Sequence, residues 1–356
     1  MTPQALAAYS EAAQCFPGNP GSTHRWGRSS REALDNARKC IYAALNFSDG
    51  RLLWTSGGTE ANNLVLQSAR SRGMRVLVAR NVHPSVWYAT GASPEFVGAL
   101  PLDREGRIDR QYLLQQLKSA EPVLVCLSHA CNETGIVQPV AELAEMCRRG
   151  GHLLHVDATQ TVGHLPLDLE AIPAHFISFS AHKFGGPRGV GGLLVREAPL
   201  LEPQVFGGSQ EWGLRAGTEN VPGAVATAAA LEAAQESLPT EVPRLRGLAR
   251  GLVGQVELAV PDALVNSDPE NGLPGLVSFC FPGTSGHDLV LELAGWGYAV
   301  SAGSACHAGS VFPSRAIVSM GRSEREALGA LRVSLGGAST ETSVANFAQK
   351  LLSILR

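Results

Sequence analysis

Short apolar runs alternate with stretches of helical spacing over roughly the first 230 residues. Strand-length apolar runs occupy residues 51–54, 75–79, 95–100, 122–128, 152–157, 175–180 and 191–196. Between them, residues 59–72, 109–120 and 139–149 carry apolar side chains at three- and four-residue spacing, which indicates amphipathic helices. Because several strands are apolar on both faces and alternate with helices, we predict an α/β fold with a mostly parallel sheet covered on both faces.

The order of the elements changes after the seventh run. Residues 221–238 and 239–256 predict two helices, the second of which leads away from the sheet. Short strands and helices follow in a different order, at residues 275–281, 287–297, 298–303, 330–337 and 343–355. We therefore predict a large domain over residues 1–240 and a smaller α+β domain over residues 241–356.

The composition restricts the possible partners and location. The 356 residues are 44% hydrophobic and 17% charged, which is typical of a globular protein with an extensive core. A net charge of −3 and a pI near 6.4 leave no basic surface of the kind that nucleic-acid binding needs. No apolar run reaches the ~18 residues of a membrane span, and the N-terminus lacks the pattern of a signal peptide. We predict a cytoplasmic protein with no membrane partner and no direct nucleic-acid partner.

The spacing of the seven cysteines does not indicate a disulfide framework. They stand at positions 15, 40, 126, 131, 147, 280 and 306, with no CxxC pair and no regular spacing with histidine. An odd number argues against paired disulfides, and the spacing argues against a structural zinc site, so no metal is expected. Cys126 and Cys280 stand in apolar runs and should be core residues. Cys306 differs because the residues around it, 301–310, are small and polar.

Polar side chains follow several of the predicted strands. In open parallel sheets the ligand site lies at the carboxyl ends of the strands. Gly58 and Thr59 stand between a strand and a helix, where backbone N–H groups can hold a phosphate, although a plain turn fits equally well. A lone histidine at a helix start, such as His83, is more often a cap than a catalytic group, and Asn132 fits a turn equally well. Asp157 ends an apolar strand with a carboxylate.

One lysine stands between a histidine and a glycine-rich turn, in SFSAHKFGGPRGVGGLLV over residues 178–195. Lys183 can be a loop or capping lysine, or a lysine held for Schiff-base chemistry. Pyridoxal phosphate would account for several features together: its phosphate would lie at Gly58 and Thr59, and its aldehyde carbon would be bound to Lys183. Asp157 would keep the pyridine nitrogen protonated. Ser180 and His182 are close enough in sequence to reach the phosphate.

Eight segments occur in the order and spacing of a known family. They are residues 55–63, 81–86, 132–139, 155–169, 178–195, 207–223, 301–309 and 330–336. From about residue 18 to residue 336 the chain resembles the NifS-like cysteine desulfurases of the class-V aminotransferase family. The resemblance implies a homodimer of pyridoxal-phosphate fold type I. It also implies conversion of L-cysteine to L-alanine, with the sulfur left as a persulfide on the enzyme.

The resemblance also implies roles for individual residues. The cofactor phosphate would be bound by Gly58, Thr59, Ser180 and His182, its ring by His83, Asp157 and Gln160, and its aldehyde by Lys183. The catalytic residues would be Lys183, Cys306 and His83, with Cys306 as the nucleophile that takes the sulfur. Asn132 and Arg332 would bind the substrate carboxylate. Thr218 would complete the phosphate site of the neighbouring subunit.

The sequence departs from the family in several places. Relatives usually begin with a strand and an Ala-Thr-Thr-Pro turn, whereas this sequence begins with MTP, so we expect some pocket contacts to differ. Cys131 stands where asparagine is frequent, and Phe312 where an acidic residue is common. Only 24 residues follow Arg332, which leaves open whether a scaffold protein docks there and which protein accepts the sulfur.

Two alternatives to a cysteine desulfurase stay open at this stage. The first is a selenocysteine or cystine lyase, or another related pyridoxal-phosphate enzyme. It would differ in its products and in its need for Cys306. The second is a non-catalytic platform that binds partners, against which the intact Lys183, Asp157 and Cys306 argue.

Overall fold

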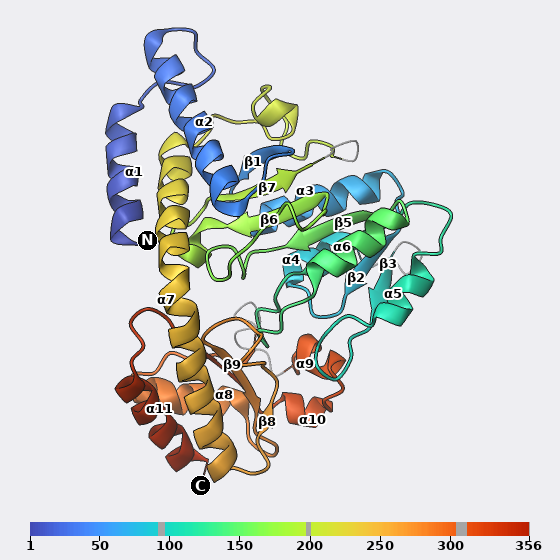
Figure 1. Cartoon of the computed structure of the whole chain (residues 1–356), viewed down its shortest axis with the longest axis vertical. Helices are drawn as coiled ribbons and strands as arrows, with labels where there is room; N and C mark the ends of the chain where they lie inside the picture. The colour runs from blue at the N-terminus through green and yellow to red at the C-terminus, as the bar shows by residue number, and fades with distance from the viewer. Residues whose placement is uncertain (92–96, 197–200, 304–311, 356) are drawn as a thin grey trace.

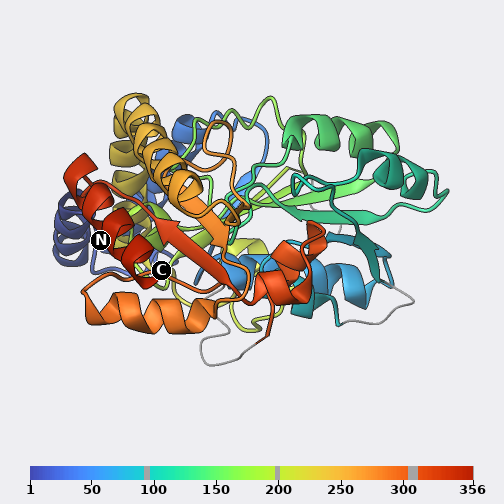
Figure 2. The same ribbon diagram turned by 90° about the horizontal axis from the view of Figure 1, so that it is seen from below.

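The computed structural model describes residues 1–91, 97–196, 201–303 and 312–355. A seven-stranded sheet with helices on both faces forms one part of the molecule, and a three-stranded sheet with its own helices forms the other (Figure 1). Seen from below in Figure 2, α5 (Arg110–Gln116) and α6 (Val140–Arg149) lie on one face of the larger sheet and α3 (Gly58–Ser71) lies on the opposite face.

The larger sheet has the strand order β1-β7-β6-β5-β4-β2-β3. Its strands are β1 (Arg51–Thr55), β2 (Val76–Ala79), β3 (Val97–Leu100), β4 (Leu124–Ser128), β5 (Leu153–Asp157), β6 (Phe176–Ser180) and β7 (Gly191–Val195). Each falls on a predicted apolar run, and β2, β4, β6 and β7 are buried along their whole length. β7 runs antiparallel to both of its neighbours, while the other pairs are parallel. The predicted α/β class with a mostly parallel sheet is confirmed.

The smaller sheet is antiparallel, with the order β10-β9-β8. Its strands are β8 (Leu264–Val265), β9 (Leu276–Cys280) and β10 (Ala330–Ser334), and the helices near it are α8 (Gly286–Gly295), α9 (Arg315–Ser319), α10 (Glu324–Ala327) and α11 (Glu341–Ile354). The remaining helices are α1 (Pro3–Cys15), α2 (Arg25–Leu45) and α4 (Pro84–Trp87), with short 3-10 turns η1 (Tyr88–Thr90), η2 (Ala181–Phe184) and η3 (Glu211–Gly213).

One long helix replaces the two helices expected after residue 220. α7 runs from Val221 to Ala259 without a break and contains Pro239 and Pro243 (Figure 1). Proline removes a backbone donor and normally ends or kinks a helix. Here both halves are anchored by packing, because Leu231 is buried against the larger sheet's core and Leu252 against the smaller sheet's core. The prediction of two separate helices was wrong because burial on both sides of the prolines holds one helix together.

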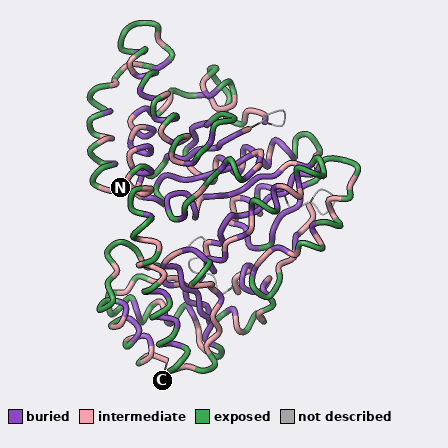
Figure 3. Tube along the Cα trace, in the orientation of Figure 1, coloured by how far each residue is buried: buried purple, intermediate pink, exposed green. Residues whose placement is uncertain are grey.

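The buried apolar residues form two main clusters. The first draws on residues from Ala5 to Leu231, and the second on residues from Leu248 to Leu351. Figure 3 shows the buried trace concentrated in the strands of both sheets. The boundary near residue 240 stays a prediction, and α7 supplies side chains to both clusters. Among the helices of the described residues, none combines the length and the apolar composition that crossing a bilayer requires.

Candidate active site

A cavity of about 320 Å³ lies where β4, β5 and β6 end, in the size range of sites for small organic ligands. The residues predicted from the sequence that line it are Gly58, Thr59, His83, Asn132, Asp157, Gln160, Ser180, His182, Lys183 and Arg332. They come from both halves of the chain, yet they meet at the carboxyl edge of the larger sheet. The position of the cavity agrees with the rule for open parallel sheets.

The start of α3 forms one wall of the cavity. Gly57 precedes the helix with φ at +154°, a conformation that favours glycine, and it provides no side-chain cap for the first N–H groups. A Cβ on Gly58 would lie 2.7 Å from the Thr159 hydroxyl oxygen, so a side chain at position 58 would crowd that hydroxyl. The Thr159 hydroxyl is buried without a hydrogen-bond partner within the described part of the chain. An uncapped helix start beside an unused hydroxyl suits an anionic ligand group.

Asp157 forms the base of the cavity at the end of β5. It is buried, and its carboxylate accepts hydrogen bonds from the Thr159 backbone N–H at 3.0 Å and from the Asn62 side-chain amide at 2.9 Å. These two donors fix the direction of the carboxylate. Because a buried carboxylate favours a protonated nitrogen as its partner, Asp157 can serve a cationic heterocycle.

Lys183 lies in η2, the turn that joins the antiparallel strands β6 and β7. The imidazole Nε2 of His164 donates to the Lys183 backbone carbonyl at 2.8 Å. Gly185 follows with φ at +87°. Ser180 Oγ and His182 Nδ1 lie 2.9 Å apart in the same turn. Burial, followed by the charges of nearby Lys183 and Arg188, lowers the pKa of His182. The turn therefore presents an amine, a hydroxyl and an imidazole to one cavity.

His83 caps the short helix α4 and also lines the cavity. Its Nδ1 accepts the backbone N–H of Ser85 at 3.1 Å and lies 2.8 Å from the Ser85 hydroxyl. Burial lowers the pKa of His83, and it is the largest of several influences. The ring is therefore a neutral imidazole at neutral pH. His83 therefore caps α4 and lines the cavity at the same time, so the two interpretations of this histidine are compatible.

Arg332 reaches the cavity from β10 of the smaller sheet. Its Nη1 donates to the backbone carbonyl of Asn132 at 2.8 Å, and its Nε is buried without a hydrogen-bond partner among the described residues. Burial lowers the pKa of this guanidinium, which stays charged because arginine is a very strong base. A half-buried arginine with an unused donor is suited to a carboxylate.

One of the predicted site residues lies outside the described part of the chain, and another lines a different pocket. Cys306 lies outside the described residues, as does His307 beside it. Thr218 lines a separate pocket of about 70 Å³ with Trp54 and Arg215. The predictions for Cys306 and Thr218 therefore stay predictions. Cys126 and Cys280 are buried in the core, as expected.

The loop that carries Thr218 is anchored by a buried carboxylate. Glu211 accepts hydrogen bonds from Arg38 Nη2 at 2.6 Å and from the Trp54 backbone N–H at 3.0 Å. Glu211 and Trp212 have φ values of +48° and +57°, which are strained for residues other than glycine. The anchor thus holds two residues in left-handed conformations a few positions before Thr218.

Four polar residues of the cavity were missed in the sequence. Asn62, Ser85, Ser128 and Thr159 line it together with the predicted residues. Asn62 is only 1% exposed although it lies in the helix α3, which packs against the sheet. The signal that could have found it is its position among Gly58, Ala61 and Val65, on the side of the helix that carries the buried residues. Ser85 and Thr159 follow a histidine and an aspartate by two positions, a spacing typical of local caps.

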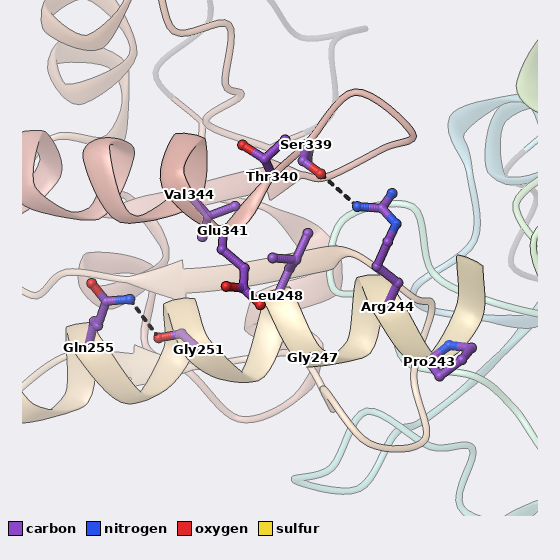
Figure 4. Close-up of a pocket in the computed structure, with 10 residues that line it drawn as sticks. All are labelled: Pro243, Arg244, Gly247, Leu248, Gly251, Gln255, Ser339, Thr340, Glu341 and Val344. Atoms are coloured by element: carbon purple, nitrogen blue, oxygen red, sulfur yellow. Dashed lines mark hydrogen bonds between the residues drawn. The ribbon is translucent and has the colours of Figure 1, made fainter. Parts of the chain in front are cut away.

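A larger cavity elsewhere does not contain this chemistry. It has about 570 Å³ and lies between α7 and the start of α11, where Arg244 donates to the Ser339 carbonyl (Figure 4). Among the described residues, neither a histidine nor a cysteine lines it, and neither does any predicted site residue. Within the described ranges, no group of three His, Cys, Asp or Glu side chains could hold a metal ion. Asp157 and Lys183 meet with the other described candidate residues in the cavity of about 320 Å³, which is therefore the candidate active site.

The chain belongs to the class-V aminotransferase family, whose model matches residues 1–347. It is 34% identical to the cysteine desulfurase IscS of Dictyoglomus turgidum, over 90% of this chain and 82% of that protein. It is 36% identical to cysteine desulfurase IscS 1 of Archaeoglobus fulgidus, over 95% of this chain and 88% of that protein. A solved structure of a NifS-like protein matches with a TM-score of 0.88 and 31% identity, covering all of this chain and 96% of the other. The resemblance to NifS-like cysteine desulfurases is confirmed, and with it the fold.

Proposed function

We propose that this protein is a pyridoxal-phosphate-dependent cysteine desulfurase that converts L-cysteine to L-alanine and carries the sulfur as a persulfide on Cys306. One observation carries the proposal. Lys183 and the buried Asp157 line the same cavity, and the uncapped start of α3 forms its wall. The cysteine desulfurases that match nearly the whole chain support the same reaction.

The residues of the cavity fit the cofactor. Its phosphate would be bound by the first N–H groups of α3 at Gly58 and Thr59, with Ser180, His182 and the unused Thr159 hydroxyl beside them. Asp157 would pair with the ring nitrogen, Gln160 with the ring hydroxyl, and His83 would cover the ring. When bound, pyridoxal phosphate supplies an electron sink for bonds at the substrate carbons. Lys183 would hold its aldehyde carbon.

The substrate carboxylate would be bound by Arg332 and Asn132. Arg332 comes from the smaller sheet and Asn132 from the turn after β4 of the larger one, and the two are joined by the hydrogen bond from the guanidinium to the Asn132 carbonyl. The unused Nε of Arg332 is a second donor for a carboxylate oxygen. The amino acid would thus be oriented by groups from both parts of the chain.

Cys306 would perform the sulfur transfer. Its thiolate attacks the sulfur of the substrate, a sulfur–sulfur bond forms, and the carbon–sulfur bond breaks with its electron pair left on the carbon. That carbon then takes up a proton and becomes the methyl group of alanine. His83 is neutral at neutral pH and lines the cavity, so we assign it the movement of protons at the substrate.

Assembly and delivery are part of the proposal. We infer a homodimer in which Thr218 completes the phosphate site of the neighbouring subunit, and a cytoplasmic location. The persulfide would be passed to an acceptor protein for iron–sulfur clusters or thio-cofactors. The large domain of residues 1–240 would hold the cofactor, and the smaller domain of residues 241–356 would carry Cys306 and Arg332.

The test is an assay of the purified, cofactor-loaded protein with L-cysteine and a thiol reductant. We expect equal amounts of alanine and sulfide. L-selenocysteine, assayed in parallel, and L-cystine, assayed without the thiol reductant that would convert it to L-cysteine, distinguish a desulfurase from the related lyases. A protein that takes up the cofactor but releases no alanine from L-cysteine would contradict the proposal.

A further inference from the structure

We propose that Asn62 is a positioning residue: it orients Ser85 and, through Ser85, holds the His83 ring with its proton on Nε2, in one hydrogen-bonded network with Asp157. The meaning of this network for catalysis rests on the proposed function. The network itself rests on contacts between described side chains of the cavity wall and the sheet beneath it.

Asn62 is at the centre of the network. It is 1% exposed, and its amide nitrogen donates to Asp157 Oδ2 at 2.9 Å and to Ser85 Oγ at 2.9 Å. Its amide oxygen accepts the hydroxyl of Ser178, a residue of β6 that is fully buried. Both hydrogens and the oxygen of the amide are therefore used.

The chemistry of the partners fixes the direction of each hydrogen bond. A carboxylate can only accept, so the amide nitrogen of Asn62 faces Asp157 and the amide cannot be turned over. Ser85 Oγ accepts from the same nitrogen, which leaves the Ser85 proton to be donated to His83 Nδ1 at 2.8 Å. The Ser85 backbone N–H points to the same ring nitrogen at 3.1 Å. With two donors on Nδ1, the neutral imidazole carries its proton on Nε2.

The far side of the network is ordered in the same way. Because the Ser178 hydroxyl donates to Asn62, its oxygen accepts from His155 Nε2 at 3.2 Å. Burial lowers the pKa of His155 to about 4, so this fully buried ring is neutral. Every proton from His155 to His83 has one assigned place. Changing the direction at any member leaves a further buried donor or acceptor unpaired, which is unfavourable.

The network has a consequence for protonation of His83. An imidazolium needs a proton on Nδ1, which would face the Ser85 N–H and force the Ser85 hydroxyl to lose its acceptor. Burial is the largest influence on the pKa of His83 and lowers it. Among the described residues, Lys183 from η2 and Arg315 from α9 lower this pKa as well, whereas Asp157 from β5 and Glu133 from the turn after β4 raise it. The network adds to burial in keeping His83 neutral.

Two variants weaken the network without adding charge. Asn62→Leu is similar in size and removes the central amide, and Ser85→Ala removes only the hydroxyl. Ser85→Thr keeps a hydroxyl and serves as the conservative rescue. Asn63→Leu is the matched control, because Asn63 is the next residue of α3 and, among the described residues, its side chain donates to the Thr59 carbonyl of its own helix and to no member of the network.

The measurement is the pH titration of His83 in long-range nitrogen–proton NMR spectra of the full chain, recorded with and without pyridoxal phosphate. The His83 signal is assigned by its loss in His83→Gln. We expect the Nε2-protonated form in the wild type, and a rise of the His83 pKa by about one unit in Asn62→Leu and Ser85→Ala. Ser85→Thr and Asn63→Leu should titrate like the wild type.

Activity provides a second readout. We expect kcat to fall about tenfold in Asn62→Leu and Ser85→Ala with KM for L-cysteine nearly unchanged, less than the ~10²–10⁴-fold that a proton-transfer group itself contributes. If both variants lose thermal stability while the His83 titration stays at the wild-type position, Asn62 is only structural and the inference is wrong. Absence of cysteine turnover in the wild type would instead overturn the proposed function, since the spectra of the cofactor-free chain test the network independently.

Discussion

Replacing Glu211 by alanine should destabilise the protein strongly, because this carboxylate is the buried anchor of the loop before Thr218. Its side chain is 2% exposed and accepts from Arg38 at 2.6 Å and from the Trp54 N–H at 3.0 Å. Removing one member of a buried ion pair costs about 3–5 kcal/mol, and an orphaned backbone N–H costs about 1–3 kcal/mol. In this variant Arg38 keeps its hydrogen bonds to Asp35 at 2.8 Å and to the Leu52 carbonyl at 3.2 Å, so the lower end of each range applies. We therefore expect a loss of about 4 kcal/mol in the free energy of unfolding.

The assay is thermal unfolding of the cofactor-free protein followed by circular dichroism. An unfolding entropy of roughly 2.1 cal/mol/K per residue over the roughly 240 residues of the predicted large domain gives about 0.5 kcal/mol/K, so the melting temperature should fall by about 8 °C. Asp35→Ala is the matched control. It removes a 47% exposed partner of the same arginine and should cost less than about 1 kcal/mol. Equal losses in the two variants would refute the assignment of Glu211 as the anchor.

Four further predictions concern the site and its surroundings. Borohydride should attach pyridoxal phosphate covalently to the wild-type chain at Lys183, as peptide mass spectrometry can show, and Lys183→Ala should lose both this attachment and the yellow colour. Cys306→Ser should keep the cofactor and bind L-cysteine but lose almost all sulfide release, and mass spectrometry of the wild type should find the extra sulfur on Cys306 alone. Sedimentation should show a dimer, and an active, cofactor-loaded monomer would contradict the role of Thr218. Burial lowers the pKa of His129 from 6.5 to about 4, so the unfolded chain binds the proton more readily and stability falls as the pH drops below 6.5. Between pH 7.5 and pH 5, urea unfolding should show that the His129→Gln variant loses about 2 kcal/mol less unfolding free energy than the wild type.

Most of the larger sheet could be predicted from the sequence because its strands are buried on both faces. A strand such as β4, with every residue buried, has to be an uninterrupted apolar run. The direction of β7 could not be read in the same way, because its Gly-Gly-Leu-Leu-Val run is as apolar as those of the parallel strands. The continuity of α7 was also hidden, because its two prolines are a stop signal in the chain and only tertiary packing overrides them.

The site was predictable where chemistry follows directly after a strand. Asp157 is the last residue of β5 and Lys183 lies just past β6, and parallel neighbours bring such residues to one edge. Arg332 lies within the other sheet, and no local pattern relates it to Asn132, so only the family resemblance indicated its role. Asn62 was missed because its importance depends on three partners from β5, β6 and the start of α4, which meet only in the folded chain.

The long helix α7 makes the molecule sensitive to small changes of angle. From Pro243 to its end at Ala259 the helix extends about 24 Å at ~1.5 Å per residue. Prolines are the usual positions at which helices bend, so a change of about 10° there would move the far end by about 4 Å. The second half of α7 is packed into the core around β9 and β10, so such a bend would displace the strand that carries Arg332. The position of that guanidinium relative to Asn132 would thus depend partly on the direction of the helix axis at Pro239 and Pro243.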